Sequence, residues 1–344
     1  MHTLPNDFLQ TNLSSSRRLG LTAAAVIAML GASGICPVAA QTPAPTYPAK
    51  PIRLVVGFAP GGAADYVARV LSEPFSRALG QSVVVENRAG AGSSIAAEHV
   101  SKSAPDGYTI LIASPSSISV NPAINPKLGY SPRDLAPVSK LTSSPLVVAV
   151  NNGLGVASIK DLIATARRSP GKLNFASSGN GSAPHLAAVL FSRVAGVDMV
   201  HVPFKGGAPA VQSVVAGDTQ VTFGTPPSVL PLMQAGRLKG LATTGRARSP
   251  LVPDLPGMQE AGVPDAEIAF WYGLFVPAGT SPAIVKRLFD TSAQILLLPE
   301  VKAALAREGT EVASSRSTEE FAAFLADDAK FWARLVRDAK VTAD

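Results

Sequence analysis

The sequence predicts an α/β protein with two lobes, each built on a mixed, mostly parallel sheet flanked by helices. Short runs rich in β-branched residues alternate with longer segments whose apolar residues recur at helical spacing. A strand, a Gly-Gly bend and a helix follow one another at residues 55–63, and the same layout recurs at residues 201–208. The 344 residues, 47% hydrophobic and 16% charged, are numerous enough for two lobes and too apolar for a disordered chain.

The expected elements follow in order along the chain. Residues 52–56 are rich in β-branched side chains and predict a strand. Residues 63–79 place apolar side chains at helical spacing and predict a helix. The other strands are expected at 82–86, 108–113, 145–150, 173–177, 199–202, 220–223, 238–243 and 268–276. The other helices are expected at 94–101, 158–168, 184–195, 209–216, 226–235, 282–298, 299–308 and 318–340.

The first forty residues have the sequence pattern of a secretory signal peptide. Arg17 and Arg18 precede the uncharged apolar stretch 19–35, and small residues follow at 37–40, where a signal peptidase would cut. Residues 41–50 then form a proline-rich tether. No later apolar run approaches the roughly 20 residues that cross a bilayer. We therefore expect a periplasmic protein with a cleaved leader, exported by either the general or the twin-arginine route.

The bend Pro60-Gly61-Gly62 is the first candidate binding loop. Glycines let a ligand approach the main chain, and the helix beginning near residue 63 presents unpaired N–H groups with partial positive charge. Such a site suits a carboxylate or a phosphate, although an ordinary tight turn has the same pattern. Asp65, in the first turn of that helix, either stabilises the helix dipole or contacts the ligand.

Three other segments place hydroxyl groups at the ends of strands. Residues 177–185 combine three serines, two glycines and His185, but lack the last glycine of a dinucleotide loop and the lysine of a phosphate loop. His185 either packs or caps there, or reaches the ligand. The Ser-Pro-Ser-Ser run at 114–117 and Thr225 either cap the following segments or donate hydrogen bonds to an anion.

Residues suited to catalysis are scarce. The sequence has no Gly-x-Ser-x-Gly elbow, and His99, His185 and His201 do not have the spacing of a zinc-binding helix. The single cysteine, Cys36, lies in the leader and excludes a disulfide framework. No basic run with interleaved aromatic residues indicates nucleic-acid binding. These features predict a binding protein with no catalytic residue, no cofactor and no metal site.

Several segments, taken in order, resemble one family. They are Tyr47-Pro48, the loop 58–62, Asn-Arg-Ala-Gly-Ala-Gly at 87–92, Pro-Asp-Gly-Tyr-Thr at 105–109, His-Val-Pro-Phe-Lys-Gly at 201–206 and Pro-Ala-Gly-Thr at 277–280. Together they resemble the Bug family, the extracytoplasmic solute receptors of tripartite tricarboxylate transporters. The resemblance implies a type II periplasmic binding protein fold, which closes like a Venus flytrap around a small carboxylated solute and delivers it to a membrane permease.

The resemblance also implies a set of binding residues. With Asp65 added, the expected ligand-binding residues are Phe58, Ala59, Gly61, Gly62, Asp65, Ser114, Ser116, Ser117, Ser178, Gly179, Ser182, His185, Lys205, Gly206 and Thr225. Lys205 either adds positive charge or is a solvated loop residue. Gly224 stands where family members often have an acidic residue, which favours a plain carboxylate over an amino acid as ligand.

We expect lobe 1 to comprise residues 51–149 and 275–344, lobe 2 to comprise residues 150–274, and hinges near 148–151 and 269–274. Two other functions remain open. An exported α/β hydrolase-like enzyme would use Ser182 with His185, its best available pairing. A ligand-binding component of a membrane sensor would have the same sequence features as a transport receptor.

Overall fold

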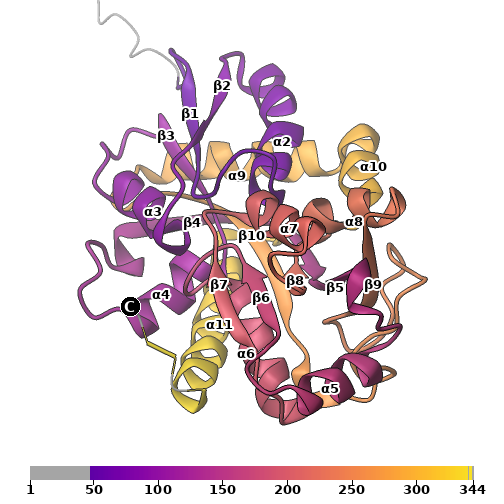
Figure 1. Cartoon of the computed structure of the whole chain (residues 1–344). Coiled ribbons are helices and arrows are strands. Elements are labelled where there is room, and N and C mark those ends of the chain that lie inside the picture. The colour runs from indigo at the N-terminus through magenta and orange to yellow at the C-terminus, as the bar shows by residue number, and fades with distance from the viewer. Residues whose placement is uncertain (1–46, 340, 343–344) are drawn as a thin grey trace, which may run out of the picture. The chain divides into compact units, whose positions relative to one another are not determined.

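The computed structural model describes residues 47–339 and 341–342, so the expected signal peptide and most of the tether lie outside the described residues. Two sheets flanked by helices make up the described fold (Figure 1). The first sheet has the strand order β11-β4-β10-β3-β1-β2, and the second has the order β7-β6-β8-β5-β9. The expected class, an α/β fold with two mixed sheets, is confirmed.

The first sheet is formed by strands from both ends of the chain. Its strands are β1 (Ile52–Val56), β2 (Val83–Asn87), β3 (Thr109–Ala113), β4 (Leu135–Pro145), β10 (Ala269–Pro277) and β11 (Glu311–Val312). The helices that accompany these strands in the sequence are α2 (Ala63–Leu79), α3 (Ser94–Ser101), α4 (Asn121–Ile124), α9 (Pro282–Leu296), α10 (Pro299–Arg307) and α11 (Thr318–Asp338). Residues 116–120 add a short π-helical turn after β3.

The second sheet is formed by the middle of the chain. Its strands are β5 (Val147–Asn151), β6 (Asn174–Ser177), β7 (Val200–Pro203), β8 (Val221–Gly224) and β9 (Leu238–Thr243). The helices between them are α5 (Ile159–Arg168), α6 (Ala183–Ala195), α7 (Gly207–Ala216) and α8 (Pro226–Gln234). Helix α7 begins two residues earlier than the sequence predicts, because Gly206 rather than Ala208 is its N-cap.

Parallel pairing is confined to the strand–helix–strand part of each sheet. Strand β1 pairs parallel with β2 and β3, and β6 pairs parallel with β7 and β8. The antiparallel share is larger than the sequence predicts, because β10 runs antiparallel to β3 and β4, and β5 runs antiparallel to β8 and β9. The chain passes from the first sheet to the second between β4 and β5, and returns between β9 and β10.

The sequence did not predict β4 or β11. Serine, threonine, lysine and proline are mixed with apolar residues in Leu135–Pro145, so no clean alternation marks the strand. Pairing with β10 along its whole length, and with β11 near its end, stabilises β4 instead. The expected strand at 145–150 corresponds to β5 alone, which begins at Val147.

Thr244 joins the two places where the chain changes sheets. The chain passes between sheets at Leu146 and again before β10 begins. The Thr244 hydroxyl accepts from Leu146 N (2.8 Å) and donates to Ile268 O (2.8 Å), while its main-chain groups bond the same two residues. The expected lobe boundaries, 149/150 and 274/275, and the expected hinges, 148–151 and 269–274, lie within β5 and β10.

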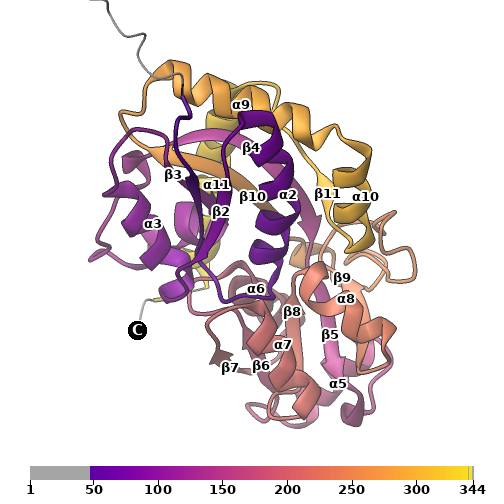
Figure 2. The same cartoon turned by 90° about the horizontal axis from the view of Figure 1, so that it is seen from above.

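Buried apolar faces hold the helices on the sheets. Val67, Leu71 and Phe75 of α2 are buried against the first sheet at helical spacing, as the sequence predicts. Figure 2 shows α2 and α3 beside strands of this sheet, and α6, α7 and α8 beside the second sheet. No helix among residues 47–339 has the length and apolar character needed to cross a membrane.

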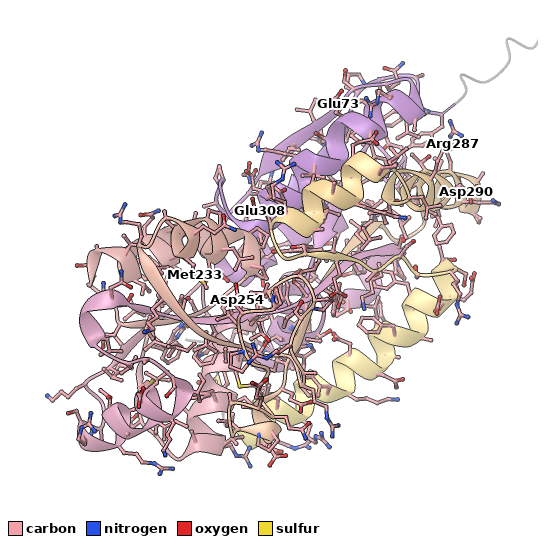
Figure 3. All side chains as sticks on the ribbon, turned by 90° about the vertical axis from the view of Figure 1, so that its right-hand side faces the viewer. Glu73, Met233, Asp254, Arg287, Asp290 and Glu308 are labelled. Atoms are coloured by element: carbon pink, nitrogen blue, oxygen red, sulfur yellow. The ribbon has the colours of Figure 1, made fainter. Side chains whose placement is uncertain are left out.

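Two hydrogen bonds join distant segments of the chain around the first sheet. Tyr47 donates its hydroxyl hydrogen to Gly107 O (2.8 Å), so the last residues of the expected tether pack onto the fold. The Arg287 guanidinium of α9 donates to Ala78 O at the end of α2 (3.2 Å). Figure 3 shows Glu73 of α2 with Arg287 and Asp290 of α9 on this side of the molecule, where all three are exposed.

Candidate functional site

The loop between β1 and α2 presents main-chain donors. Gly62 is the N-cap of α2, and it makes no side-chain cap, so the first N–H groups of the helix have no capping side chain as acceptor. Gly61 has a φ of 80°, a left-handed conformation that glycine adopts with little strain. The loop therefore ends in a helix N-terminus with partial positive charge.

The loop between β7 and α7 repeats this arrangement and meets the first loop. Gly206 is the N-cap of α7, again without a side-chain cap. Ala59 N donates to Lys205 O (3.0 Å), and a Cβ placed on Gly206 would lie only 3.0 Å from Ala59 N. The N-terminal ends of α2 and α7 consequently lie next to each other (Figures 1 and 2).

A small cavity lies at this meeting point, with a volume of about 20 Å³. Its lining comes from both sheets and contains no Asp, Glu, Lys or Arg side chain: Phe58, Gly62, Ala63, Ala64, Ser116, Ser178, Pro184, Gly207, Ala210, Val211, Thr222, Gly224, Thr225, Phe270 and Tyr272. Helix N-termini and hydroxyl groups favour an anion in such a place. The volume has room for about one water molecule, so a larger solute requires the two loops to separate.

A second cavity of about 230 Å³ adjoins the first, because Phe58 and Ser178 line both. It is lined further by the loop 90–93, by Gly179 and Asn180, and by residues 203–205. Among the described residues that line the two cavities, only Lys205 carries a full charge, and its side chain is exposed. A ligand that extends from the first cavity past Ser178 therefore enters the second cavity, where Lys205 supplies a positive charge.

The loop 90–93 has an unusual backbone. Gly90, Ala91, Gly92 and Ser93 all have positive φ, which is uncommon for alanine and serine. Asn121 Nδ2 donates to the carbonyls of Ala91 (3.2 Å) and Gly92 (3.0 Å), and these bonds hold the loop. This loop was not among the predicted binding residues, although its glycines were a visible signal in the sequence.

Asp65 lies behind the first loop and lines neither cavity. Its carboxylate accepts from Gly61 N (3.0 Å), Arg69 Nε (2.9 Å) and Asn87 Nδ2 (3.1 Å). Burial pushes the pKa of Asp65 upward, but these hydrogen bonds outweigh burial and leave the pKa below its ordinary value. Asn87 Nδ2 also donates to Phe58 O (3.1 Å), so the charged carboxylate holds the loop from behind.

The structure brings some predicted residues together and leaves others outside the cavities. Phe58, Gly62, Ser116, Ser178 and Thr225 line the first cavity, and Gly179 and Lys205 join in lining the second. The remaining predicted residues line neither: Ala59, Gly61, Asp65, Ser114, Ser117, Ser182, His185 and Gly206. Ala59 and Gly206 instead form the contact between the two loops.

The predicted serines differ in their hydrogen bonding. Ser182 caps α6, because its hydroxyl accepts from His185 N (3.3 Å). The Ser116 hydroxyl, which lines the first cavity, accepts from Ala183 N (3.2 Å) and so joins the two sheet regions. The hydroxyls of Ser114 and Ser117 are buried with no hydrogen-bond partner among the described residues.

Two aromatic residues of β10 were missed as lining residues. Phe270 and Tyr272 face the first cavity, whereas Trp271 between them points to the other side and hydrogen-bonds Asp328 (2.9 Å). Strand alternation was the available signal, since residues two apart share a face. Burial raises the pKa of the Tyr272 phenol, so the phenol keeps its proton at neutral pH.

The chain is similar to several known proteins. Residues 67–341 match the family model described as "Tripartite tricarboxylate transporter family receptor". The periplasmic binding protein BugD is 30% identical, with a TM-score of 0.83 over 87% of this chain and 100% of BugD. Rpa4515 of R. palustris, solved with adipate, is 34% identical, with a TM-score of 0.83 over 86% of this chain and 99% of Rpa4515. MatC of Rhodopseudomonas palustris, solved with bound malate, is 30% identical, with a TM-score of 0.81 over 84% of this chain and 100% of MatC.

Proposed function

This chain belongs to the tripartite tricarboxylate transporter receptor family, and we propose that it is an exported receptor that binds a small organic carboxylate and releases it unchanged. The observation that carries this proposal is the meeting of two helix N-termini without side-chain caps at one cavity. Two positive dipole ends and several hydroxyls there favour an anion, and no ionisable nucleophile or base is needed to hold it.

The carboxylate would be held chiefly by main-chain N–H groups. We assign it to the N-termini of α2 and α7, with the hydroxyls of Ser116, Ser178 and Thr225 as further donors. The residues behind the loops, Asp65 among them, would keep these donors in place. Because the donors come from both sheets, they would converge on the carboxylate only when the two lobes close.

The lobes would move about the two crossings near Thr244. On this basis lobe 1 would contain residues up to Pro145 together with β10 and everything after it, and lobe 2 would contain the second sheet. Opening would break the Ala59–Lys205 hydrogen bond, and closure on the solute would exclude water from the donors. Each hydrogen bond to the anion is stronger in the drier, closed site.

We propose that the solute is a dicarboxylate and not an amino acid. Among residues 47–339 and 341–342, no acidic side chain lines either cavity, so no carboxylate from this part of the chain is placed to pair with an ammonium group. A second carboxylate that passes Ser178 would enter the larger cavity and approach the Lys205 ammonium. The adipate and malate bound by two similar proteins are both dicarboxylates, which supports the same class here.

The partner would be the membrane permease of a tripartite tricarboxylate transporter, which the family description implies. The closed receptor would dock on the permease in the periplasm and open to release the solute. Uptake of labelled solute into vesicles that contain the permease should require the receptor. Equal uptake without the receptor would contradict the transport role but not the binding proposal.

A thermal-shift screen of the mature protein tests the ligand class. The panel should contain mono-, di- and tricarboxylates, aromatic acids and amino acids, followed by calorimetry of every compound that raises the melting temperature. A solute at 100 times its Kd should add about 2.7 kcal/mol to the free energy of unfolding. Tight binding of aspartate or glutamate with no binding of malate or adipate would contradict the dicarboxylate proposal.

A matched pair of variants tests Lys205. Lys205→Gln should weaken dicarboxylate binding about tenfold and leave a monocarboxylate of the same length nearly unchanged, because only the distal charge loses its partner. Lys205→Arg should keep most of the preference. An equal loss for both ligands would show that Lys205 acts on the loop and not on the second carboxylate.

A further inference from the structure

Two histidine rings stack on each other beside the loop 177–182, which follows β6. His185, in the first turn of α6, lies parallel to His201 of β7, with 3.9 Å between ring centroids and 7° between planes. Phe175 of β6 continues the stack, 4.9 Å from His201. His185 is only 8% exposed and lines neither cavity, so its ring is packed inside the fold and does not form a cavity wall.

Each imidazole makes a hydrogen bond that ends in the loop 177–182. Gly181 N donates to His185 Nδ1 (3.3 Å), and His201 Nε2 lies 2.6 Å from Ser177 Oγ. Ser177 Oγ in turn accepts a hydrogen bond from Gly179 N (3.1 Å) and donates one to Gly179 O (3.2 Å). Both ends of the loop are therefore tied to one stacked pair of rings.

The loop needs such a support because of its composition. Gly179 and Gly181 have φ values of 125° and 66°, which glycine reaches easily but also leaves easily. The same loop contributes Ser178 to both cavities and Gly179 to the second. A loop that is ordered before the solute arrives costs less conformational entropy on binding than one ordered by the solute.

The acceptor role of His185 requires a neutral ring. Burial and the neighbouring His201 lower the pKa of His185 to about 3, so Nδ1 carries a lone pair at neutral pH. A neutral imidazole has one donor and one acceptor nitrogen, and here Nδ1 is the acceptor for Gly181 N. The hydrogen bond of His185 to Gly181, that of His201 to Ser177 and the stacking of the two rings therefore hold the loop together.

We propose that His185 and His201 are positioning residues, which hold the loop 177–182 in the conformation that receives the solute. This inference rests on the proposed function for its link to binding. The link to loop order stands on the stack and the hydrogen bonds alone. Neither ring contacts the solute in this arrangement, and both act through Ser177, Gly179 and Gly181.

Substitutions that keep one property of each ring test the proposal. His185→Phe keeps a stacking ring but removes the acceptor, whereas His185→Asn keeps a side-chain acceptor near the position of Nδ1 and removes the ring. His201→Phe and His201→Gln form the corresponding pair. The readouts are amide hydrogen exchange at Gly179 and Gly181 without ligand, the affinity for malate and adipate, and the melting temperature.

Loss of one such hydrogen bond should speed exchange of the bonded amide and weaken solute binding about tenfold. We expect this directly for His185→Phe at Gly181. For His201→Phe we expect it at Gly179, because the lost bond to His201 Nε2 no longer holds Ser177 Oγ, the acceptor of Gly179 N. His185→Asn and His201→Gln should stay closer to the unaltered protein. A purely structural role would lower the melting temperature in all four variants without separating the two members of each pair.

Two results would overturn the inference. Unchanged exchange at both glycines in the phenylalanine variants would show that the histidines do not hold the loop. Faster exchange with unchanged affinity would show that they hold it without positioning it for the solute. If the unaltered protein binds neither probe nor any other carboxylate, the proposed function fails, and exchange alone then decides whether the rings order the loop.

Discussion

The Ala59 N–H donates a hydrogen bond to the Lys205 carbonyl across 3.0 Å, so two glycine loops from different sheets touch through their main chains. Each loop leads into a helix whose N-terminus makes no side-chain cap. The bond places both positive helix ends at the wall of one cavity. A solute held there would have to displace this contact, so under the proposed function the two loops separate here when the receptor opens.

Gly62→Val should abolish solute binding while the protein still folds. A Cβ on Gly62 would stand 3.6 Å from Gly207 N, an ordinary contact, but the two added methyl groups occupy the cavity of about 20 Å³. Calorimetry should show at least a hundredfold loss of affinity, and circular dichroism an unchanged fold. Ala157→Val, which adds the same type of bulk at an exposed position, is the control. Unaltered affinity in Gly62→Val would mean that the loop is only a turn.

Thr244→Val should destabilise the protein more than Thr243→Val. Both side chains are buried, but the Thr244 hydroxyl bonds Leu146 and Ile268, whereas the Thr243 hydroxyl has no partner among the described residues. Valine at 244 leaves a buried N–H and a buried carbonyl short of a partner, at a cost of about 1–3 kcal/mol. Denaturant titration of both variants measures the difference, and equal stabilities would refute the role of Thr244.

Asp65→Asn should weaken the first loop more than Arg69→Met does. The Asp65 carboxylate accepts three hydrogen bonds, and an asparagine amide would direct N–H groups at one or more of the same donors. The expected loss is about 1–3 kcal/mol of stability together with weaker solute binding. Arg69 is 57% exposed in its side chain, so its ion pair should contribute little. A larger effect of Arg69→Met in thermal denaturation would reverse this ranking.

His185 should make the protein less stable as the pH falls below 6.5. Its pKa is about 3 in the folded protein and 6.5 as a free side chain, so the unfolded chain binds a proton that the folded chain does not. The free energy of unfolding therefore decreases from pH 6.5 downward. Melting temperatures measured from pH 7 to pH 4 should fall more steeply for the unaltered protein than for His185→Phe. Parallel curves would show that His185 does not contribute to the acid sensitivity.

The alternation of strands and helices, the two Gly-Gly loops and most element ranges were readable in the sequence, because they depend on local periodicity and on glycine at bends. Helix α2, for example, begins and ends where its apolar spacing predicts. Local patterns also singled out Gly62, Ser116, Ser178 and Thr225, and the family resemblance added Phe58; the fold brings these five residues to one cavity.

The pairing between distant segments had no local signal. Strand β4 has a mixed composition and exists because β10, more than a hundred residues later, pairs with it. The same holds for Phe270 and Tyr272 at the cavity, for the loop 90–93, and for Thr244 at both crossings. Only the folded chain shows that Asp65 and His185 support the loops from behind, because hydrogen-bond direction and ring stacking depend on partners that the chain brings together in three dimensions.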